Sequence, residues 1–553
     1  MHGEKLLIVM RMPFLCSFLL LFSASPARSQ ETNPAVASDT SQTSQDASAG
    51  TVLKRVTRAV VLDVVVTDKA GRPVSGLGTA DFTLLEDGQL QTIASFEAST
   101  SVHPVLNAHE ARASKESSPV PRPEIAQVIL LLDEMNTGFK DLAYARYSMG
   151  KLLRKNGGQL QQSTALMALT DQGLKLLHDS TRDGNALWNS LDHHSPQLPW
   201  RLNGSVYGAS ERLGISLGAL AEIASAGEGS TVRRNIIWIS PGFPILSGLD
   251  ITPESRDKAF AAIRNLSDKL LRARVTVYTV DPRGVPGASS LSTLSSASPS
   301  TFNATYFQIF SQTNNPAFGD LALQHFARET GGKSFWGHNN IDAEVASSIS
   351  EGTNYYTLSY YPSNSLFDGN FRKIAVTLRR PELAARTRDG YFAMPEPPPP
   401  TEHELTDQIE VALSNPLSYV GIPVSARASV LPSSPGSVRI VLTGDRRALT
   451  WNTSINGDQQ CPLIAVAAAF SSASNEKPVR IQKEDFAYVL PAAKVSSLSE
   501  KPVVYTLDFP LDSAVSRIRI LLRDKISGRT GSADLSAPFS PSPDSHRQVV
   551  QPN

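Results

Sequence analysis

The sequence predicts an α/β protein. We expect a mainly parallel sheet covered by helices on both faces, flanked by a small N-terminal β domain and a C-terminal β-sandwich. Between residues 124 and 393, short apolar runs alternate with stretches of helical periodicity, which is typical of a parallel sheet. Residues 51–97 and 405–540 instead contain short strand-like runs separated by turn residues.

Size, charge and cysteine usage narrow the class of protein further. The chain has 553 residues, which is too long for a single hydrophobic core, so several domains are expected. Lys+Arg and Asp+Glu both total 52, so the charge balance indicates no nucleic-acid or anionic-membrane partner. Of the two cysteines, Cys16 lies in the apolar N-terminal run and Cys461 in the last domain. Signal cleavage would leave Cys461 as the only cysteine, so we expect stability to come from packed cores and not from disulfides.

The N-terminus reads as an export signal over residues 1–29. Arg11 precedes the apolar run Pro13–Phe22, and Ala27–Ser29 has the small-x-small pattern of a cleavage site. The run is too short to span a bilayer, and no later stretch is long and apolar enough to do so. We expect an exported protein in the periplasm, the outer cell envelope or the medium; an uncleaved anchor or a buried helix is the alternative.

Polar and Pro-rich stretches separate the predicted domains. Residues 30–50 carry almost no large apolar side chains and should form a disordered tether. Residues 98–123 are a polar linker, and residues 394–404 begin with a stiff Pro-rich spacer. The tail, 541–553, is expected to be disordered.

The region 51–97 should fold as a small β domain. Val60–Val66 is rich in β-branched residues, and Lys69–Pro73 has turn chemistry. Phe82–Glu86, followed by Asp87-Gly88, predicts a strand entering a hairpin, with Gln91–Phe96 as the returning strand.

In the region 124–393, three continuous apolar runs predict strands buried on both faces: Val128–Leu132, Asn235–Ser240 and Val275–Val280. Helical spacing recurs over 142–152, 213–224, 254–272 and 319–330, and further strands are expected at 165–169, 174–177, 355–361 and 371–379. Residues 288–318 look like a loop insertion. After residue 405, alternating runs predict the sandwich strands at 424–430, 438–442, 463–470, 503–509 and 518–522.

Several motifs in this order resemble a von Willebrand factor A domain and, more closely, the secreted von Willebrand A-related proteins typical of acidobacteria. They lie at 64–74, 81–88, 132–137, 237–243, 277–284, 330–332, 355–360 and 390–392. The resemblance covers roughly residues 55–393. It implies a Rossmann-like parallel sheet of the von Willebrand A type, and it implies little about function.

The resemblance also implies a place for a metal. Members that bind Mg²⁺ use an Asp-x-Ser-x-Ser loop after the first strand, a distant Thr, and an Asp after a later strand. Here Asp133 and Thr137 match the first and last positions of that loop, whereas Met135 replaces a hydroxyl with a thioether that suits Mg²⁺ poorly. Pro241 stands where the later carboxylate is expected. For the distant hydroxyl the sequence offers Ser205, Ser210 and Ser216 without deciding among them.

Two interpretations of this degenerate site compete. In one, Asn136, Glu134 or Asp281 rebuilds the site, and a weakly bound Mg²⁺ bridges to a partner carboxylate. In the other, which we favour, no cofactor binds; Asp133 caps the following helix, and Asn136 and Thr137 hold the turn.

Other patterns that could carry chemistry have ordinary explanations. Gly214–Gly218 matches G-x-S-x-G around Ser216 but lacks the preceding strand that a nucleophile elbow needs. His193-His194 should be a solvated loop, because adjacent side chains do not face one metal. His109-Glu110 lacks the second His of a zinc-protease helix. The Tyr-rich run at 355–361 should be core in part, and a contact surface is the alternative, because Tyr is favoured at interfaces.

We therefore expect an exported, non-catalytic binding or adhesion protein that meets a protein partner through strand-end loops. The expected contact residues are Asp133, Glu134, Asn136, Thr137, Ser240 and Asp281. The alternatives are a structural or assembly scaffold of the cell envelope and, less favoured, a hydrolase that uses Ser216.

Overall fold

The fold is described from a computed structural model. It covers residues 58–98, 127–196, 206–230, 232–242, 253–284, 326–337, 339–431, 434, 436–471, 477–495, 501–511 and 515–541. The chain divides into two compact units, Met1–Val56 and Thr57–Asn553, and the described residues belong to the second. Several predictions fall outside these residues: the export signal, the tether 30–50, nearly all of the linker 98–123, the insertion 288–318 and the tail beyond 541.

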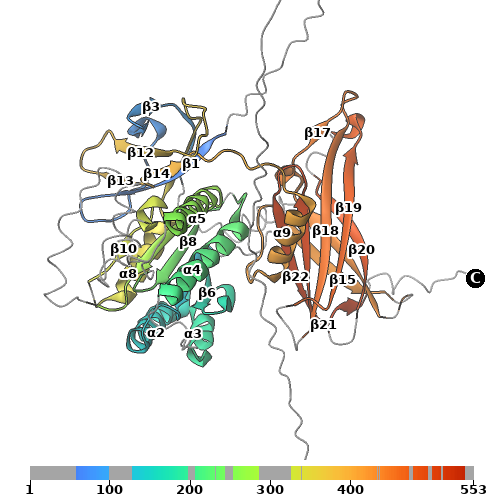
Figure 1. The fold of residues 1–553 in the computed structure, drawn as a ribbon, viewed down its shortest axis with the longest axis horizontal. Helices are drawn as coiled ribbons and strands as arrows, with labels where there is room; N and C mark the ends of the chain where they lie inside the picture. The colour runs from blue at the N-terminus through green and yellow to red at the C-terminus, as the bar shows by residue number, and fades with distance from the viewer. Residues whose placement is uncertain are drawn as a thin grey trace, which may run out of the picture. The chain divides into compact units, whose positions relative to one another are not determined.

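A six-stranded sheet forms the centre of the α/β region, with the strand order β10-β9-β8-β5-β6-β7 (Figure 1). Its strands are β5 (Val128–Asp133), β6 (Gln159–Thr170), β7 (Gly173–Asp183), β8 (Arg234–Ile239), β9 (Val275–Val280) and β10 (Ser334–Phe335). Every neighbouring pair is parallel except β6 and β7. The prediction of a mainly parallel sheet is confirmed.

Helices cover both faces of this sheet. They are α2 (Phe139–Leu153), α3 (Gly184–His193), α4 (Val206–Gly227), α5 (Pro253–Arg272) and α8 (Ile341–Thr353). Alternate residues of β5 belong to two different cores: Ile129 and Leu131 pack with α4 and α5, whereas Leu130 and Leu132 pack with α2, α3 and α8. All six residues of β5 are buried, which explains its uninterrupted apolar sequence.

The N-terminal strands do not form a domain by themselves. They are β1 (Val60–Thr67), β2 (Phe82–Glu86), β3 (Gln89–Gln91) and β4 (Ile93–Ala98), and they pair with β11 (Tyr356–Tyr360), β12 (Phe371–Leu378), β13 (Ala384–Arg386) and β14 (Gly390–Phe392). The two sheets so formed have the orders β13-β1-β11-β4 and β14-β12-β2-β3. The α/β region is thus inserted between β4 and β11.

This pairing corrects the sequence analysis, which placed the strands at 355–361 and 371–379 with the parallel sheet. Val60 instead lies opposite Tyr360, and Phe82 lies opposite Leu378. Alternation along a strand indicates that one face is buried but does not identify the strand that will pair with it. Tyr356 and Tyr360 are core, whereas Tyr361 is exposed.

The expected Asp87-Gly88 hairpin is present between β2 and β3. Both turn residues have positive φ, 48° and 81°, as a two-residue hairpin turn requires. The return strand is Gln89–Gln91, so the prediction of Gln91–Phe96 is wrong: after Gln91 the chain crosses to the other sheet and pairs there with β11 as β4.

The C-terminal region contains two sheets that share one core, and their strands pair antiparallel except for β15 and β23. One has the order β20-β16-β15-β23, and the other has β17-β18-β21-β22 with β19 also paired to β18. The strands are β15 (Val424–Val430), β16 (Ser437–Gly444), β17 (Asn452–Thr453), β18 (Gln459–Ser471), β19 (Arg480–Leu490), β20 (Val503–Pro510), β21 (Val515–Asp524), β22 (Thr530–Ser536) and β23 (Ser540–Pro541). Each strand expected here is present.

Helix α9 (Glu402–Ser414) precedes these sheets and was not predicted. Its start carries a capping box: the Thr401 hydroxyl accepts from the Glu404 backbone N–H, and the Glu404 carboxylate accepts from Thr401 N–H at 2.8 Å. The Thr-x-x-Glu pattern after the prolines was therefore a usable signal. Short 3₁₀ turns occupy Thr79–Asp81, Lys155–Gly158, Arg446–Ala448 and Ala492–Lys494. No helix in the described part of the chain is long and apolar enough to cross a membrane.

Candidate functional site

The carboxyl ends of the parallel strands bring the predicted site residues together around Asp133. This residue ends β5 and is fully buried. Its carboxylate accepts from Asn136 N–H at 2.8 Å on Oδ1, and on Oδ2 from Asn136 Nδ2 at 2.9 Å, Trp238 Nε1 at 3.2 Å and Ser240 Oγ at 2.7 Å. Two of these donors belong to its own loop and two come from the end of β8. The carboxylate therefore ties neighbouring strand ends together.

Burial dominates the electrostatics of Asp133. Loss of hydration raises the pKa of its carboxyl group above the ordinary value, although the hydrogen bonds from Asn136, Ser240 and Trp238 act in the opposite direction. Arg212 of α4 lies near enough to interact with this charge, but burial of Arg212 lowers its own pKa. The structure thus holds Asp133 mainly by directional hydrogen bonds.

The helix cap that we expected at Asp133 is not formed. Helix α2 starts at Phe139 with Gly138 as its N-cap residue, and no side chain bonds to that cap. Asp133 closes the preceding turn by accepting from the backbone of Asn136 three residues later. Asp suits such turns because its short side chain reaches nearby backbone N–H groups.

Asn136 also links this loop to α4. Its Nδ2 lies 3.3 Å from the Ser216 hydroxyl, so Ser216 is the candidate distant hydroxyl that reaches the site. Ser205 and the side chain of Ser210 fall outside the described residues. Ser216 lies within α4 and is completely buried, so the G-x-S-x-G pattern here is not the strand–turn–helix elbow of a hydrolase.

The two later loops meet through Arg283. Its guanidinium donates to the Asp281 carboxylate from Nε at 3.0 Å and from Nη2 at 2.7 Å, and Nη2 also donates to Pro241 O at 3.0 Å. Asp281 is therefore engaged by a cation of its own loop. That contact connects the end of β9 to the end of β8.

Glu134 and His194 form a buried pair that sequence reasoning missed. His194 Nε2 lies 2.6 Å from Glu134 Oε1, and the two side chains are 7% and 0% exposed. The expected solvent exposure holds for His193, although this residue ends helix α3 and does not lie in a loop, and the expectation is wrong for His194. The two residues are 60 positions apart, so no local sequence pattern predicts their contact. The acidic residue Glu134 beside the strand-end Asp133 was the one available signal.

The oxygens available here fit a divalent cation poorly. Asp133 Oδ2 already accepts three hydrogen bonds, whereas a carboxylate oxygen offers about two lone pairs. Met135 packs in the hydrophobic core, and Pro241 supplies no carboxylate. Asn136 Oδ1 and Thr137 Oγ1 are buried without a hydrogen-bond partner, and they are the remaining uncharged oxygens that could bind a cation. Within the described residues, no group of three or more His, Cys, Asp or Glu side chains could hold a metal.

Burial also divides the six residues that we expected to touch a partner. Asp133, Glu134 and Ser240 are fully buried, and Thr137 is 5% exposed. These four can position the loops but offer almost no surface for contact. Asn136 and Asp281 are the two that retain partial exposure.

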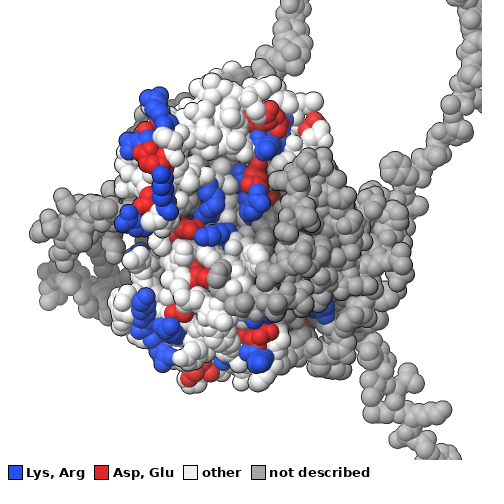
Figure 2. All heavy atoms as spheres, turned by 90° about the vertical axis from the view of Figure 1, so that its left-hand side faces the viewer, with Lys and Arg blue, Asp and Glu red and all other residues white. Residues whose placement is uncertain are grey.

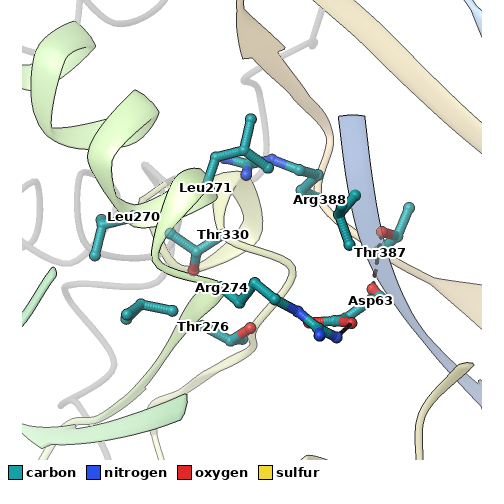
Figure 3. A pocket seen from close by; sticks show the side chains of 10 residues that line it. Asp63, Leu270, Leu271, Arg274, Thr276, Thr330, Thr387 and Arg388 are labelled. Carbon is teal, nitrogen blue, oxygen red and sulfur yellow. Dashed lines mark hydrogen bonds and ion pairs between the residues drawn. The ribbon is translucent and has the colours of Figure 1, made fainter. Parts of the chain in front are cut away.

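A separate pocket lies between α5 and the loop that joins β13 to β14 (Figure 3). Arg274 lines it and donates to Asp63, and the Thr387 hydroxyl donates to the backbone carbonyl of Asp63 at 3.0 Å. The hydroxyl of Thr330 donates to Ala327 O at 2.8 Å. Arg274, Thr387 and Thr330 are each engaged by protein groups, so these contacts explain local packing and do not assign a ligand.

Comparisons with known proteins identify no family for this chain. No protein-family model matches it, and a search of curated proteins found no match. Among solved structures it is similar to an aerotolerance-related membrane protein from Bacteroides fragilis, at 17% identity and TM-score 0.25, covering 41% of this chain and 99% of that one.

Two further likenesses are to the VWA domain of SpRpn10 and to the pilus adhesin SpaC from Lactobacillus rhamnosus GG. The first has 13% identity and TM-score 0.17, covering 28% of this chain and 75% of that one. The second has 7% identity and TM-score 0.21, covering 74% and 54%. The fold described above therefore stands on its own strand order and pairing.

Proposed function

We propose that this chain is an exported, non-catalytic binding protein whose von Willebrand A-like α/β region meets a protein partner at the carboxyl ends of its parallel strands. Loops at this edge of a parallel sheet commonly carry binding sites. The observation that carries the proposal is the hydrogen-bonded closure of Asp133 by donors from β8 and from its own loop. Such a closure organises the edge without a metal.

Preorganisation is the physical reason that this closure favours binding. The contacts Asp133–Ser240, Asn136–Ser216 and Arg283–Pro241 join three strand ends and one helix. Loops held in this way lose less conformational entropy when a partner docks on them. The N-terminal signal pattern supports export.

The test uses the full chain and extracts of the cell envelope. Asn136→Ala/Asp281→Ala removes the two partly exposed strand-end side chains, and Gln127→Ala, at the opposite end of β5, is the matched control. We expect a partner captured by the wild type and by the control to be lost from the double variant. Capture that is equal for all three proteins would contradict the proposal and favour a scaffold role.

A cation-dependent site is the second candidate, and one observation favours it: Asn136 Oδ1 and Thr137 Oγ1 are buried oxygens without partners. Calorimetric titration of the full chain with Mg²⁺ and Mn²⁺ separates the two candidates. We expect no saturable binding below about 1 mM, since few charged ligands are available. Binding that Thr137→Val abolishes would favour the cation instead.

A further inference from the structure

We propose that the outward face of α2 is a docking surface for an acidic segment of a protein partner. This inference rests on the proposed function only in assuming that a protein is bound near this edge. Helix α2 begins two residues after Thr137, so its first turn adjoins the strand-end loops. The residues that form the surface, called here the α2 outer face, are Phe139, Lys140, Tyr144, Tyr147, Lys151 and Arg154.

Helical periodicity separates this face from the core. Leu142, Ala145, Met149 and Leu153 point into the core beneath the sheet. On the opposite side, Tyr147 is 66% exposed, and Phe139, the first residue of the helix, is 69% exposed. Exposure of large aromatic side chains to water costs free energy, which burial against a partner would recover. Tyr is also enriched where proteins meet.

The charge of α2 departs from that of the whole chain. Between Phe139 and Leu153, the bounds of α2, there are three basic residues and one acidic residue, a formal net charge of +2, whereas the chain has a formal net charge of zero. On the face drawn in Figure 2, basic and acidic side chains are interspersed, as that overall balance leads one to expect. This excess of basic side chains favours a partner that carries carboxylates, and Asp342 already pairs with one of them, Lys151.

Several groups of this face are held in place before any partner arrives. Lys151 Nζ lies 2.9 Å from the Asp342 carboxylate, and the Tyr144 hydroxyl donates to Asn339 O at 2.6 Å. The Arg154 guanidinium lies 4.5 Å from the ring centroid of Trp188. Side chains held in place lose less conformational entropy when the carboxylates of a partner bind them. A lipid surface or a nucleic acid would need only a diffuse positive charge.

The test measures binding of a fluorescent glutamate homopeptide to the full chain. A glutamine homopeptide of the same length, vesicles of phosphatidylglycerol and a thymidine oligonucleotide serve as comparison probes. The variants are Lys140→Glu and Tyr147→Ala. Lys483→Glu on β19 is the matched control, because Lys483 is also exposed and its substitution makes the same change in net charge away from α2.

We expect the glutamate peptide to bind, the glutamine peptide not to bind, and added salt to weaken binding. Lys140→Glu and Tyr147→Ala should each lower the affinity about tenfold, and Lys483→Glu should change it less than about twofold. The inference is overturned by no binding of the glutamate peptide, by an equal loss in the Lys483→Glu control, or by tighter binding of vesicles or oligonucleotide at the same face. If the strand-end variants leave partner capture unchanged while the α2 variants abolish peptide binding, the proposed function fails and this inference stands.

Discussion

The hydroxyl of Ser240 donates a 2.7 Å hydrogen bond to the carboxylate of Asp133, and this contact joins the ends of two adjacent parallel strands. A metal-binding version of this edge would need the lone pairs of that carboxylate for the cation. Here protein donors occupy them. The polar groups at the strand ends therefore contribute to the stability of the fold as well as to the shape of the candidate site.

The indole N–H of Trp238 should be worth a measurable part of that stability. Trp238→Phe keeps an aromatic ring in the core but removes the donor to buried Asp133. We expect the free energy of unfolding in urea to fall by about 1–3 kcal/mol. Trp451→Phe removes an indole donor to Arg446 O at a partly exposed position and should cost less. An equal loss in both variants would contradict this role of Trp238.

Substitution of the two neighbouring histidines, His193 and His194, should change the free energy of unfolding by very different amounts. His194→Ala removes a hydrogen-bond partner of the fully buried Glu134 carboxyl group, and we expect the free energy of unfolding to fall by about 1–3 kcal/mol. His193→Ala alters an exposed side chain and should change it by less than about 0.5 kcal/mol. Denaturant unfolding of both variants measures the difference, and a small effect at both positions would argue against the buried pair.

The carboxyl group of Glu329 should make stability fall as pH rises. Burial raises its pKa to about 8 from 4.5, and neither carboxylate oxygen has a hydrogen-bond partner. The folded-state pKa is raised, so the protonated carboxyl group is favoured in the folded protein. Its contribution to the free energy of unfolding is complete below the unfolded-state pKa and is lost as pH rises through the folded-state pKa. Between these pH values wild type should lose up to about 1.4 kcal/mol per pH unit relative to Glu329→Gln.

Unfolding in denaturant at several pH values from about 5 to about 9 tests this sign. Glu404→Gln is the control, because hydrogen bonds from Thr401 lower the pKa of Glu404. Its contribution is present above the unfolded pKa, so the difference between wild type and this variant should be flat over the same range. A flat difference for Glu329→Gln as well would refute the prediction.

Arg519 should be a major anchor of α9. It is 1% exposed, its Nη1 donates to Asn415 O just past the end of α9, and its Nη2 donates to Asp534 at 2.8 Å. We expect Arg519→Met to lower the free energy of unfolding by about 3–5 kcal/mol, since carbonyls and a carboxylate lose their donor. Arg439→Met breaks an exposed pair with Asp508 and should cost at most about 1 kcal/mol.

A disulfide can test the long-range strand pairing. The hydroxyls of Ser95 on β4 and Ser359 on β11 lie 2.6 Å apart. In Ser95→Cys/Ser359→Cys we therefore expect a disulfide to form under mild oxidation, seen as faster migration in non-reducing electrophoresis. Burial raises the pKa of the Cys461 thiol to about 12, so this cysteine should not compete. Two free thiols in the folded double variant would refute the pairing of β4 with β11.

The sequence by itself determined the local elements. The continuous apolar run Val128–Leu132 could only be a strand or helix buried on all sides, and its length and flanking turns favoured the strand. Asp87-Gly88 specified a hairpin, because few residues adopt positive φ twice in succession. The clustering of Asp133, Asn136 and Ser240 followed from the rule that parallel strands end at one edge. Each of these inferences uses information carried within a few residues.

Only the tertiary structure decided which distant segments meet. It paired β1 with β11 across about 290 residues of chain, placed His194 on Glu134, and turned Asp133 toward Trp238 instead of toward a helix end. The physical reason is that strand pairing and side-chain hydrogen bonding depend on complementary partners brought together by packing. Alternating hydrophobicity or a lone polar residue shows that a partner is needed, and the folded chain selects it.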